Sequence, residues 1–316
     1  MSFRESFLDE VCSEGDLDPF VYVKMSNESM PEEFYRYRAF SDNNKDALRN
    51  GYEWMSYPNE YNDPFDARLF YDADDVINYV LNSLLVSRLD KDELKVSRKI
   101  IGVKEIDLNA GRFDNQLLQG ARKKGGKLTS KVKGLVSKVD EIIKVLPKDL
   151  DSELEKHVRE RSMICSFTTT CDNELMWAHY TYSHQGYCLE YGQPDIHPQK
   201  GGLLLPVVYR EKPLFVTGFM KDSFPDGKNA SKAVIGSAIV KSKRWEYEDE
   251  WRYCLLCNEE SRHLKAFKPK RLLLGCNANE STKKELIEIC QQIGLPMYQM
   301  ERSPSSFAIV IGKQLV

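Results

Sequence analysis

Residues 243–257 read Lys-Arg-Trp-Glu-Tyr-Glu-Asp-Glu-Trp-Arg-Tyr-Cys-Leu-Leu-Cys, a run of charges that leads into an apolar tail. The tail and the alternation before it predict a β-strand over Tyr247–Cys257. Side chains two residues apart share a face of a strand, so Glu246, Glu248 and Glu250 are expected on one face. Like charges on one face repel, and burial would raise the pKa of at least one carboxylate. The segment therefore indicates an exposed edge strand, an ion-paired network or a site that meets positive charge.

Strand and helix patterns alternate along the rest of the chain. Period-two alternation and short apolar runs predict strands at 34–40, 52–57, 163–168, 187–191, 203–209, 271–275 and 307–311. Helical spacing predicts helices near 175–180, 230–241 and 281–293. Strands and helices interleaved in this way predict an α+β fold built on a mixed sheet.

Two segments depart from this texture. Residues 1–33 are acidic and interrupted by Pro19 and Pro31, which predicts an N-terminal arm with at most one short helix. Residues 34–316 are expected to form a single α+β domain that is interrupted by a helical insert at about 73–160. The insert is predicted because apolar residues such as Val76 and Val80 recur there at helical spacing among many charges.

The insert contains a strongly basic stretch at 122–138. It holds seven Lys and Arg residues, no acidic residue and the pair Gly125-Gly126. Such a stretch attracts phosphate backbones, so a nucleic-acid partner is one expectation. A solvated loop is the alternative, because aromatic residues are not interleaved with the charges.

Composition limits the class of protein. A net charge of −3 argues against a globally basic nucleic-acid coat, and an apolar fraction of 41% excludes a wholly disordered chain. No apolar stretch approaches the roughly 18 residues that span a bilayer, and the acidic start lacks the pattern of a secretory signal. We therefore expect a cytoplasmic protein with no membrane partner.

The cysteines do not predict a disulfide framework or a metal site. Eight of them are scattered through a long chain, which is typical of free thiols. Cys254 and Cys257 are three residues apart on an expected strand, so their side chains point to opposite faces and cannot jointly hold a metal. No resident metal is expected.

Five ordered motifs carry a family resemblance. They are Tyr35-Arg-Tyr-Arg38, Asn62-Asp-Pro-Phe65, Cys165-Ser-Phe-Thr168, Met176-Trp-Ala-His-Tyr180 and Trp245-Glu-Tyr-Glu-Asp-Glu-Trp-Arg252. In this order the chain resembles the DUF2971 family of uncharacterised bacterial proteins, over about residues 34–315 apart from the insert. The family name carries no biochemical function.

The same order is similar to the signature of ADP-ribosyltransferases, which has an Arg on a first strand, a Ser/Thr-bearing strand and a later Glu-x-Glu. This resemblance implies a transferase-like mixed sheet and NAD as substrate. Glu250 would stabilise the positive charge that develops on the ribose when nicotinamide leaves, and Glu248 would orient or deprotonate the acceptor.

Further roles follow from the same resemblance. Arg36 or Arg38 would clamp the pyrophosphate through a planar guanidinium, and Ser166 or Thr168 would brace the catalytic glutamate. The resemblance also implies stacking on the nicotinamide ring by an aromatic side chain. The candidates for that role are Tyr61, Trp177 and Tyr180.

Each of these residues also has a structural interpretation. Arg36 and Arg38 would neutralise Glu248 and Glu250 in a buried network, and Trp177 would pack in the core. Ser166 and Thr168 would be ordinary strand residues. The sequence itself departs from the transferase pattern, with Ser-Phe-Thr in place of Ser-Thr-Ser and about eighty residues between Thr168 and Glu248.

The leading hypothesis is an NAD-dependent ADP-ribosyltransferase-like enzyme that modifies a macromolecule, either nucleic acid or protein. The resemblance suggests a setting among intracellular toxins and anti-phage defence effectors. One alternative is a metal-dependent nuclease or phosphodiesterase that uses Asp63, Asp66, Glu248 and Glu250. A second alternative is a non-catalytic interaction module in which the same charges form a closed salt network. The enzyme hypothesis requires a cavity where early-strand arginines face the two glutamates.

Overall fold

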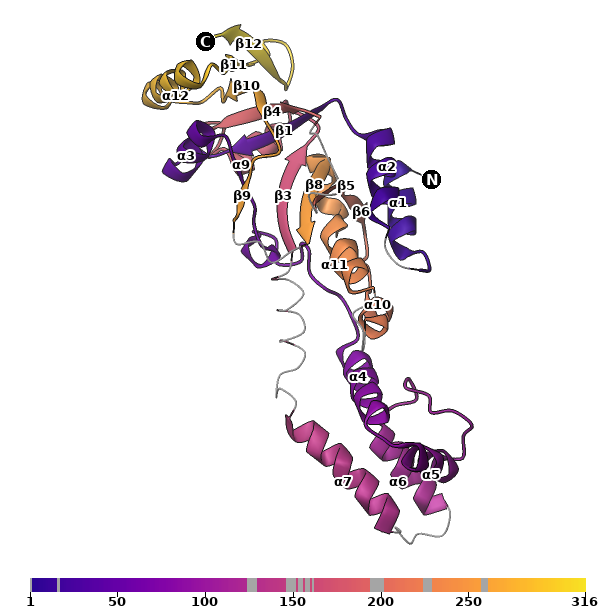
Figure 1. The fold of residues 1–316 in the computed structure, drawn as a ribbon. Helices are drawn as coiled ribbons and strands as arrows, with labels where there is room; N and C mark the ends of the chain where they lie inside the picture. The colour runs from indigo at the N-terminus through magenta and orange to yellow at the C-terminus, as the bar shows by residue number, and fades with distance from the viewer. Residues whose placement is uncertain are drawn as a thin grey trace.

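An eight-stranded mixed sheet runs through the main body of the protein (Figure 1). The computed structural model describes residues 2–15, 18–123, 130–145, 152, 156, 160, 162–193, 202–223, 229–256 and 261–316. The strand order is β12-β11-β10-β4-β1-β3-β8-β5, with β10 and β11 parallel and the other neighbours antiparallel. The bounds are β1 Glu33–Arg38, β3 Ser162–Thr168, β4 Tyr187–Gly192, β5 Gly202–Pro206, β8 Glu250–Leu256, β10 Pro269–Leu274, β11 Met297–Arg302 and β12 Ile309–Gln314. The predicted α+β class is confirmed.

Two short strand pairs flank the main sheet. β2 (Glu53–Trp54) pairs with β9 (His263–Leu264), and β6 (Val208–Arg210) pairs in parallel with β7 (Val240–Ser242). The strand expected at 203–209 therefore divides at Val207, just after Pro206, which lacks the N–H that a continuing ladder needs. The β6–β7 pair carries Lys241.

One face of the sheet is covered by α3 (Asp42–Asn50) and α12 (Glu280–Ile293). α12 begins after the cap Asn279 and ends at Gly294, whose φ of 67° suits a residue without a Cβ. Its Leu286 and Ile289 pack with strand residues such as Phe167 and Trp251 in the largest apolar cluster.

The opposite face is covered by α1 (Phe3–Cys12), α2 (Pro19–Ser29), α9 (Glu174–Tyr180) and α11 (Ala230–Ile239). The N-terminal segment thus differs from the expected arm. It forms two helices, because Phe7, Leu8 and Val11 lie on one face of α1 and bury against the sheet. Asp18 caps α2 and Pro19 opens it, so the proline that was expected to break structure begins a helix instead.

Helices α4 (Ala73–Ser87), α5 (Lys91–Ile101), α6 (Phe113–Lys123) and α7 (Ser130–Val145) extend away from the sheet as a lobe (Figure 1). The lobe has its own apolar cluster, formed by Leu85, Phe113, Leu117 and Leu135. Val76 and Val80 of α4 join it to Met220 of α10 (Thr217–Asp222). No helix of the described residues is both long and apolar enough to cross a membrane.

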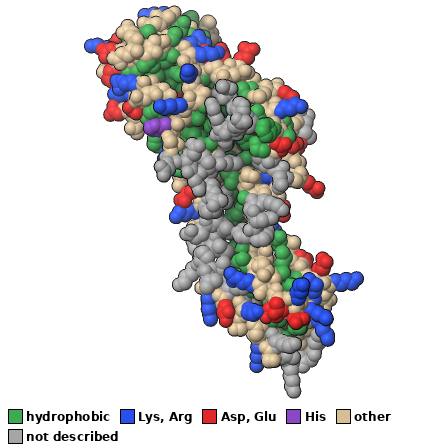
Figure 2. Space-filling model, viewed as in Figure 1, with side chains coloured by type: hydrophobic (Ala, Val, Ile, Leu, Met, Phe, Trp, Pro, Cys, Tyr) green, Lys and Arg blue, Asp and Glu red, His purple; other side chains and the backbone are tan. Residues whose placement is uncertain are grey.

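The basic stretch 122–138 is only partly described, since residues 124–129 lie outside the described part of the chain. Lys138 of α7 forms an ion pair with Glu93 of α5. Figure 2 shows Lys and Arg side chains mixed with Asp and Glu over this lobe. The seven described cysteines are free, and Cys257 lies outside the described residues.

The burial of Phe7 in α1 can be tested by mutation. Phe7 is fully buried, whereas Phe20 of α2 is 67% exposed. Phe7→Ala is expected to lower the free energy of unfolding by about 3–5 kcal/mol, because it opens a cavity between α1 and the sheet. Urea unfolding followed by circular dichroism measures this, with Phe20→Ala as the matched control that should change little. Equal effects of the two substitutions would contradict the packing described here.

Candidate functional site

The Glu-x-Glu segment does not begin as a strand. Lys243–Glu248 form a 3₁₀-helix, η3, and β8 starts only at Glu250. Between them Asp249 has a φ of 42°, a left-handed conformation that Asp tolerates better than most residues. The Asp249 carboxylate accepts hydrogen bonds from the side chains of Arg4 and Thr169. The expected strand from Tyr247 is therefore wrong at its start.

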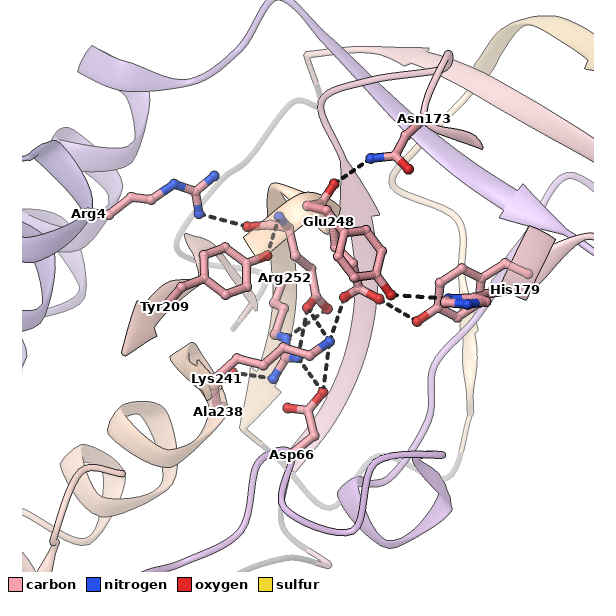
Figure 3. A network of polar contacts seen from close by, with 12 residues as sticks. Arg4, Asp66, Asn173, His179, Tyr209, Ala238, Lys241, Glu248 and Arg252 are labelled. Carbon is pink, nitrogen blue, oxygen red and sulfur yellow. Dashed lines mark hydrogen bonds and ion pairs between the residues drawn. The ribbon is translucent and has the colours of Figure 1, made fainter. Parts of the chain in front are cut away.

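The turn at Asp249 directs both glutamates to one lysine (Figure 3). Lys241 Nζ lies 2.6 Å from Glu248 Oε2, 3.1 Å from Glu250 Oε2 and 3.2 Å from Asp66 Oδ2. Arg252 donates from Nε and Nη2 to the two oxygens of Glu250, each at 2.9 Å, and from Nη2 to Asp66 at 2.8 Å. All five side chains are buried. We call them the carboxylate network; it joins three carboxylates to two cations.

The two glutamates have opposite pKa shifts. Burial raises the pKa of Glu248 above its ordinary value of 4.5, and the neighbouring charge of Glu250 raises it further. Burial also acts to raise the pKa of Glu250, but Arg252 and Lys241 outweigh it and hold that pKa well below 4.5. One carboxylate is therefore firmly ionised, while the other takes up a proton more readily.

A cavity of about 200 Å³ opens against this network. β1, β3, α9 and the segment 56–66 supply the other walls. The hydroxyl of Tyr61 and Oδ1 of Asp66 are buried at the cavity and have no hydrogen-bond partner among the described residues. An unsatisfied buried polar atom costs about 1–3 kcal/mol, which a polar ligand in the cavity would recover.

The Ser/Thr strand borders the cavity beside β8. Ser166 is paired with Arg252 and Thr168 with Glu250 in the β3–β8 register, so all four side chains lie on the cavity face. The Ser166 side chain hydrogen-bonds Glu250. Thr168 Oγ1 accepts from the backbone N–H of Thr170.

The arginines of β1 do not face the glutamates. Alternation along β1 turns Tyr35 and Tyr37 toward α9 and turns Arg36 and Arg38 to the opposite face, where both pair with Glu53. Both arginines line the cavity, and their guanidinium groups are paired with Glu53. The expectation that they neutralise Glu248 and Glu250 is wrong, because their carboxylate partner is Glu53 on the other face of the sheet. Their role in holding a pyrophosphate stays a prediction.

The aromatic candidates divide into two groups. Trp177 is fully buried, packs edge-on against Tyr37 and donates from Nε1 to the Cys171 carbonyl at 2.8 Å, so it belongs to the core. Tyr180 lines the cavity and donates its hydroxyl hydrogen to Glu248, and Tyr61 lines the same cavity. Asn173 caps α9 and donates to the Tyr247 carbonyl, which fixes α9 over η3.

The acidic loop contributes one residue to the network. Asp66 contacts Lys241 and Arg252, whereas Asp63 accepts the N–H of Phe65 and stabilises its own turn. No cluster of three or more His, Cys, Asp or Glu residues suited to a metal is found in the described ranges. The point at which the three carboxylates converge holds the ammonium group of Lys241 instead.

Sequence reasoning missed two important residues. Lys241 follows the mostly apolar run 233–240, and a lysine that ends a buried run is a signal that it needs a carboxylate partner. Tyr209 of β6 accepts the backbone N–H of Glu250 at 2.8 Å, and no local pattern predicts this contact.

Comparison with known proteins finds a family match that includes most of the carboxylate network. Residues 176–253 match the model of a family described as "Protein of unknown function (DUF2971)", which supports the family resemblance over that part of the chain. The matched span contains Tyr180, Lys241, Glu248, Glu250 and Arg252. No curated protein and no solved structure matches the chain.

The raised pKa of Glu248 yields a prediction on stability. As the pH rises above 4.5, Glu248 loses its proton in the unfolded chain at a lower pH than in the folded chain. Between these two pKa values the folded state therefore becomes less stable as the pH rises. Glu248→Gln removes this contribution. The free energy of unfolding of the variant, relative to wild type, should therefore rise between pH 4.5 and pH 8 in urea titrations. Glu246→Gln, in the same turn but exposed, is the control; parallel curves for wild type and Glu248→Gln would contradict the assignment.

Proposed function

We propose that this protein is an NAD-dependent ADP-ribosyltransferase-like enzyme that modifies a macromolecule. One observation carries the proposal: Glu248 and Glu250 stand at the wall of one cavity with pKa values displaced in opposite directions. Paired carboxylates with separated pKa values are the arrangement that glycosidic-bond chemistry uses. The proposed setting is that of an intracellular toxin or anti-phage defence effector.

The proposed reaction assigns a task to each glutamate. The bond between the ribose C1′ and the nicotinamide nitrogen breaks, and its electron pair leaves with nicotinamide. The ionised Glu250 stabilises the positive charge that develops on the ribose, with Arg252 and Ser166 holding its carboxylate in position. A nucleophilic oxygen or nitrogen of the acceptor then bonds to C1′, and its proton passes to Glu248.

The cavity suits the reacting end of such a substrate. Its volume of about 200 Å³ is below the roughly 300–1,000 Å³ of pockets that enclose a whole drug-sized ligand, so the remainder of the dinucleotide would lie outside it. Tyr61 and Tyr180 offer aromatic faces, and the unpartnered Tyr61 hydroxyl and Asp66 Oδ1 offer polar contacts to an amide or a sugar hydroxyl.

Nicotinamide release tests the central step. Purified protein is incubated with NAD labelled in the nicotinamide ring, alone and with RNA, DNA or protein acceptors. Glu250→Gln should lower the rate by about 10²–10³, since it removes the charge that stabilises the ribose cation. Glu246→Gln should retain the wild-type rate, and a thermal melt of each variant separates lost chemistry from lost folding.

Absence of nicotinamide release by the wild-type protein with every acceptor would overturn the proposal. It would favour the interpretation of the carboxylate network as a structural salt network.

The proton-accepting role of Glu248 has its own test. The Tyr180 hydroxyl lowers the pKa of Glu248 by donating to it, so Tyr180→Phe should raise that pKa. The ascending limb of the profile of transfer rate against pH should then move to higher pH, while the rate on the plateau falls less than in Glu250→Gln. An unmoved limb would assign the proton to another group.

A further inference from the structure

A second, larger hollow lies next to the cavity. It has a volume of about 680 Å³, and Asn62 and Lys241 line both spaces. Its walls come from the loop 62–70 on one side and from the segments 210–214 and 240–247 on the other. We call it the basic groove, for the side chains that line it.

Four exposed cations line the basic groove: Arg68, Arg210, Lys212 and Arg244. Within the described part of the chain, Arg210, Lys212 and Arg244 form no ion pair with a carboxylate. Of the acidic residues at the groove, Glu211 is exposed, while Asp63 is engaged with the backbone of its own turn. Arg210, Lys212 and Arg244 against the one exposed carboxylate of Glu211 leave the groove with an excess of positive charge among the described residues.

Aromatic side chains stand among these cations. Phe65 is 59% exposed at the groove, and the half-buried Trp245 lines the wall of η3. Phe70 also lines the groove and packs with Phe215, which lies outside it, at a ring distance of 6.4 Å. Exposed aromatic rings offer faces on which bases can stack.

We infer that the basic groove binds single-stranded nucleic acid and leads one of its nucleotides to the carboxylate network. The role of that strand as acceptor rests on the proposed function; the binding itself does not. Grooves that combine backbone-tracking cations with aromatic platforms are the recognised physical solution for single strands, whose bases are free to stack. Arg210, Lys212 and Arg244 already exceed what the two charges of one pyrophosphate require, which favours a chain of phosphates over the distal half of NAD.

The basic groove differs from the basic stretch 122–138 in two respects. The described cations of that stretch include Lys138, which is already paired with Glu93, and no aromatic residue is interleaved with them. The groove also adjoins the carboxylate network, whereas the helical lobe projects away from the sheet (Figure 1). The two surfaces are therefore separable by mutation.

Fluorescence anisotropy with labelled oligonucleotides of about 12 nucleotides tests the inference on the full chain without NAD. Single-stranded RNA and DNA are compared with the matching duplex at several salt concentrations. The double variant Arg210→Glu/Arg244→Glu should weaken single-strand binding by at least about tenfold and flatten its salt dependence. Trp245→Ala should weaken it by about tenfold through lost stacking. The matched control is Lys133→Glu/Lys144→Glu on the exposed surface of α7, which should bind as wild type does.

Three outcomes would overturn the inference. They are preference for duplex, an equal loss in the α7 control, and groove-dependent binding of ADP-ribose with no oligonucleotide binding. Nicotinamide release is measured separately, so failure of strand binding with intact release removes this inference alone. Strand binding without nicotinamide release would leave the groove assignment standing and remove the proposed function.

Discussion

The architecture around the cavity depends on one interaction, the contact of the Lys241 ammonium with three buried carboxylates. Each ion in the carboxylate network loses hydration on burial, and that loss is several kcal/mol per ion even after relaxation. Arg252 offsets part of it through its two-point contact with Glu250 and its bond to the Ala238 carbonyl. The count still leaves one carboxylate more than cations, and Asp66 Oδ1 has no partner among the described residues. An unpartnered buried carboxylate oxygen costs free energy that a polar ligand in the cavity would recover.

The carboxylate network is built from segments that lie far apart in the sequence, so all of them are needed to form the cavity. Asp66 comes from the loop before the helical lobe, Lys241 from β7, and Glu250 from β8. Arg4 of α1 donates to the Glu250 carbonyl and contacts Asp249, so the N-terminal helix holds the turn that aims both glutamates. Unfolding of α1 would therefore release the left-handed turn, and with it the geometry of the site. The N-terminal helices are part of the machinery that positions the cavity.

Local sequence patterns were sufficient to predict part of the fold and of the candidate site, but not the contacts between distant segments. Period-two alternation predicted the strands near β1, β3 and β4 and the α+β class, because burial of one face leaves a local signature. The Glu248–Glu250 pair was also visible as a local pattern. Lys241 was not predicted as their partner, because the contact depends on how β7 lies against η3. The sequence also did not predict on which face of the sheet Arg36 lies. Alternation shows which residues of one strand share a face, but not which residues of another strand lie on that same face.

The two faces of the sheet carry buried charge of opposite sign. On the face that carries α3 and α12, Arg36 and Arg38 share Glu53, which leaves one cation in excess, and burial together with Arg38 lowers the pKa of Arg36 to about 10. On the cavity face the carboxylates are in excess. In the first cluster Tyr191 donates to Glu53, and both clusters border the cavity. Asp66 Oδ1 in the carboxylate network has no such partner among the described residues, so the unmatched polar atom lies where a ligand in the cavity could supply one.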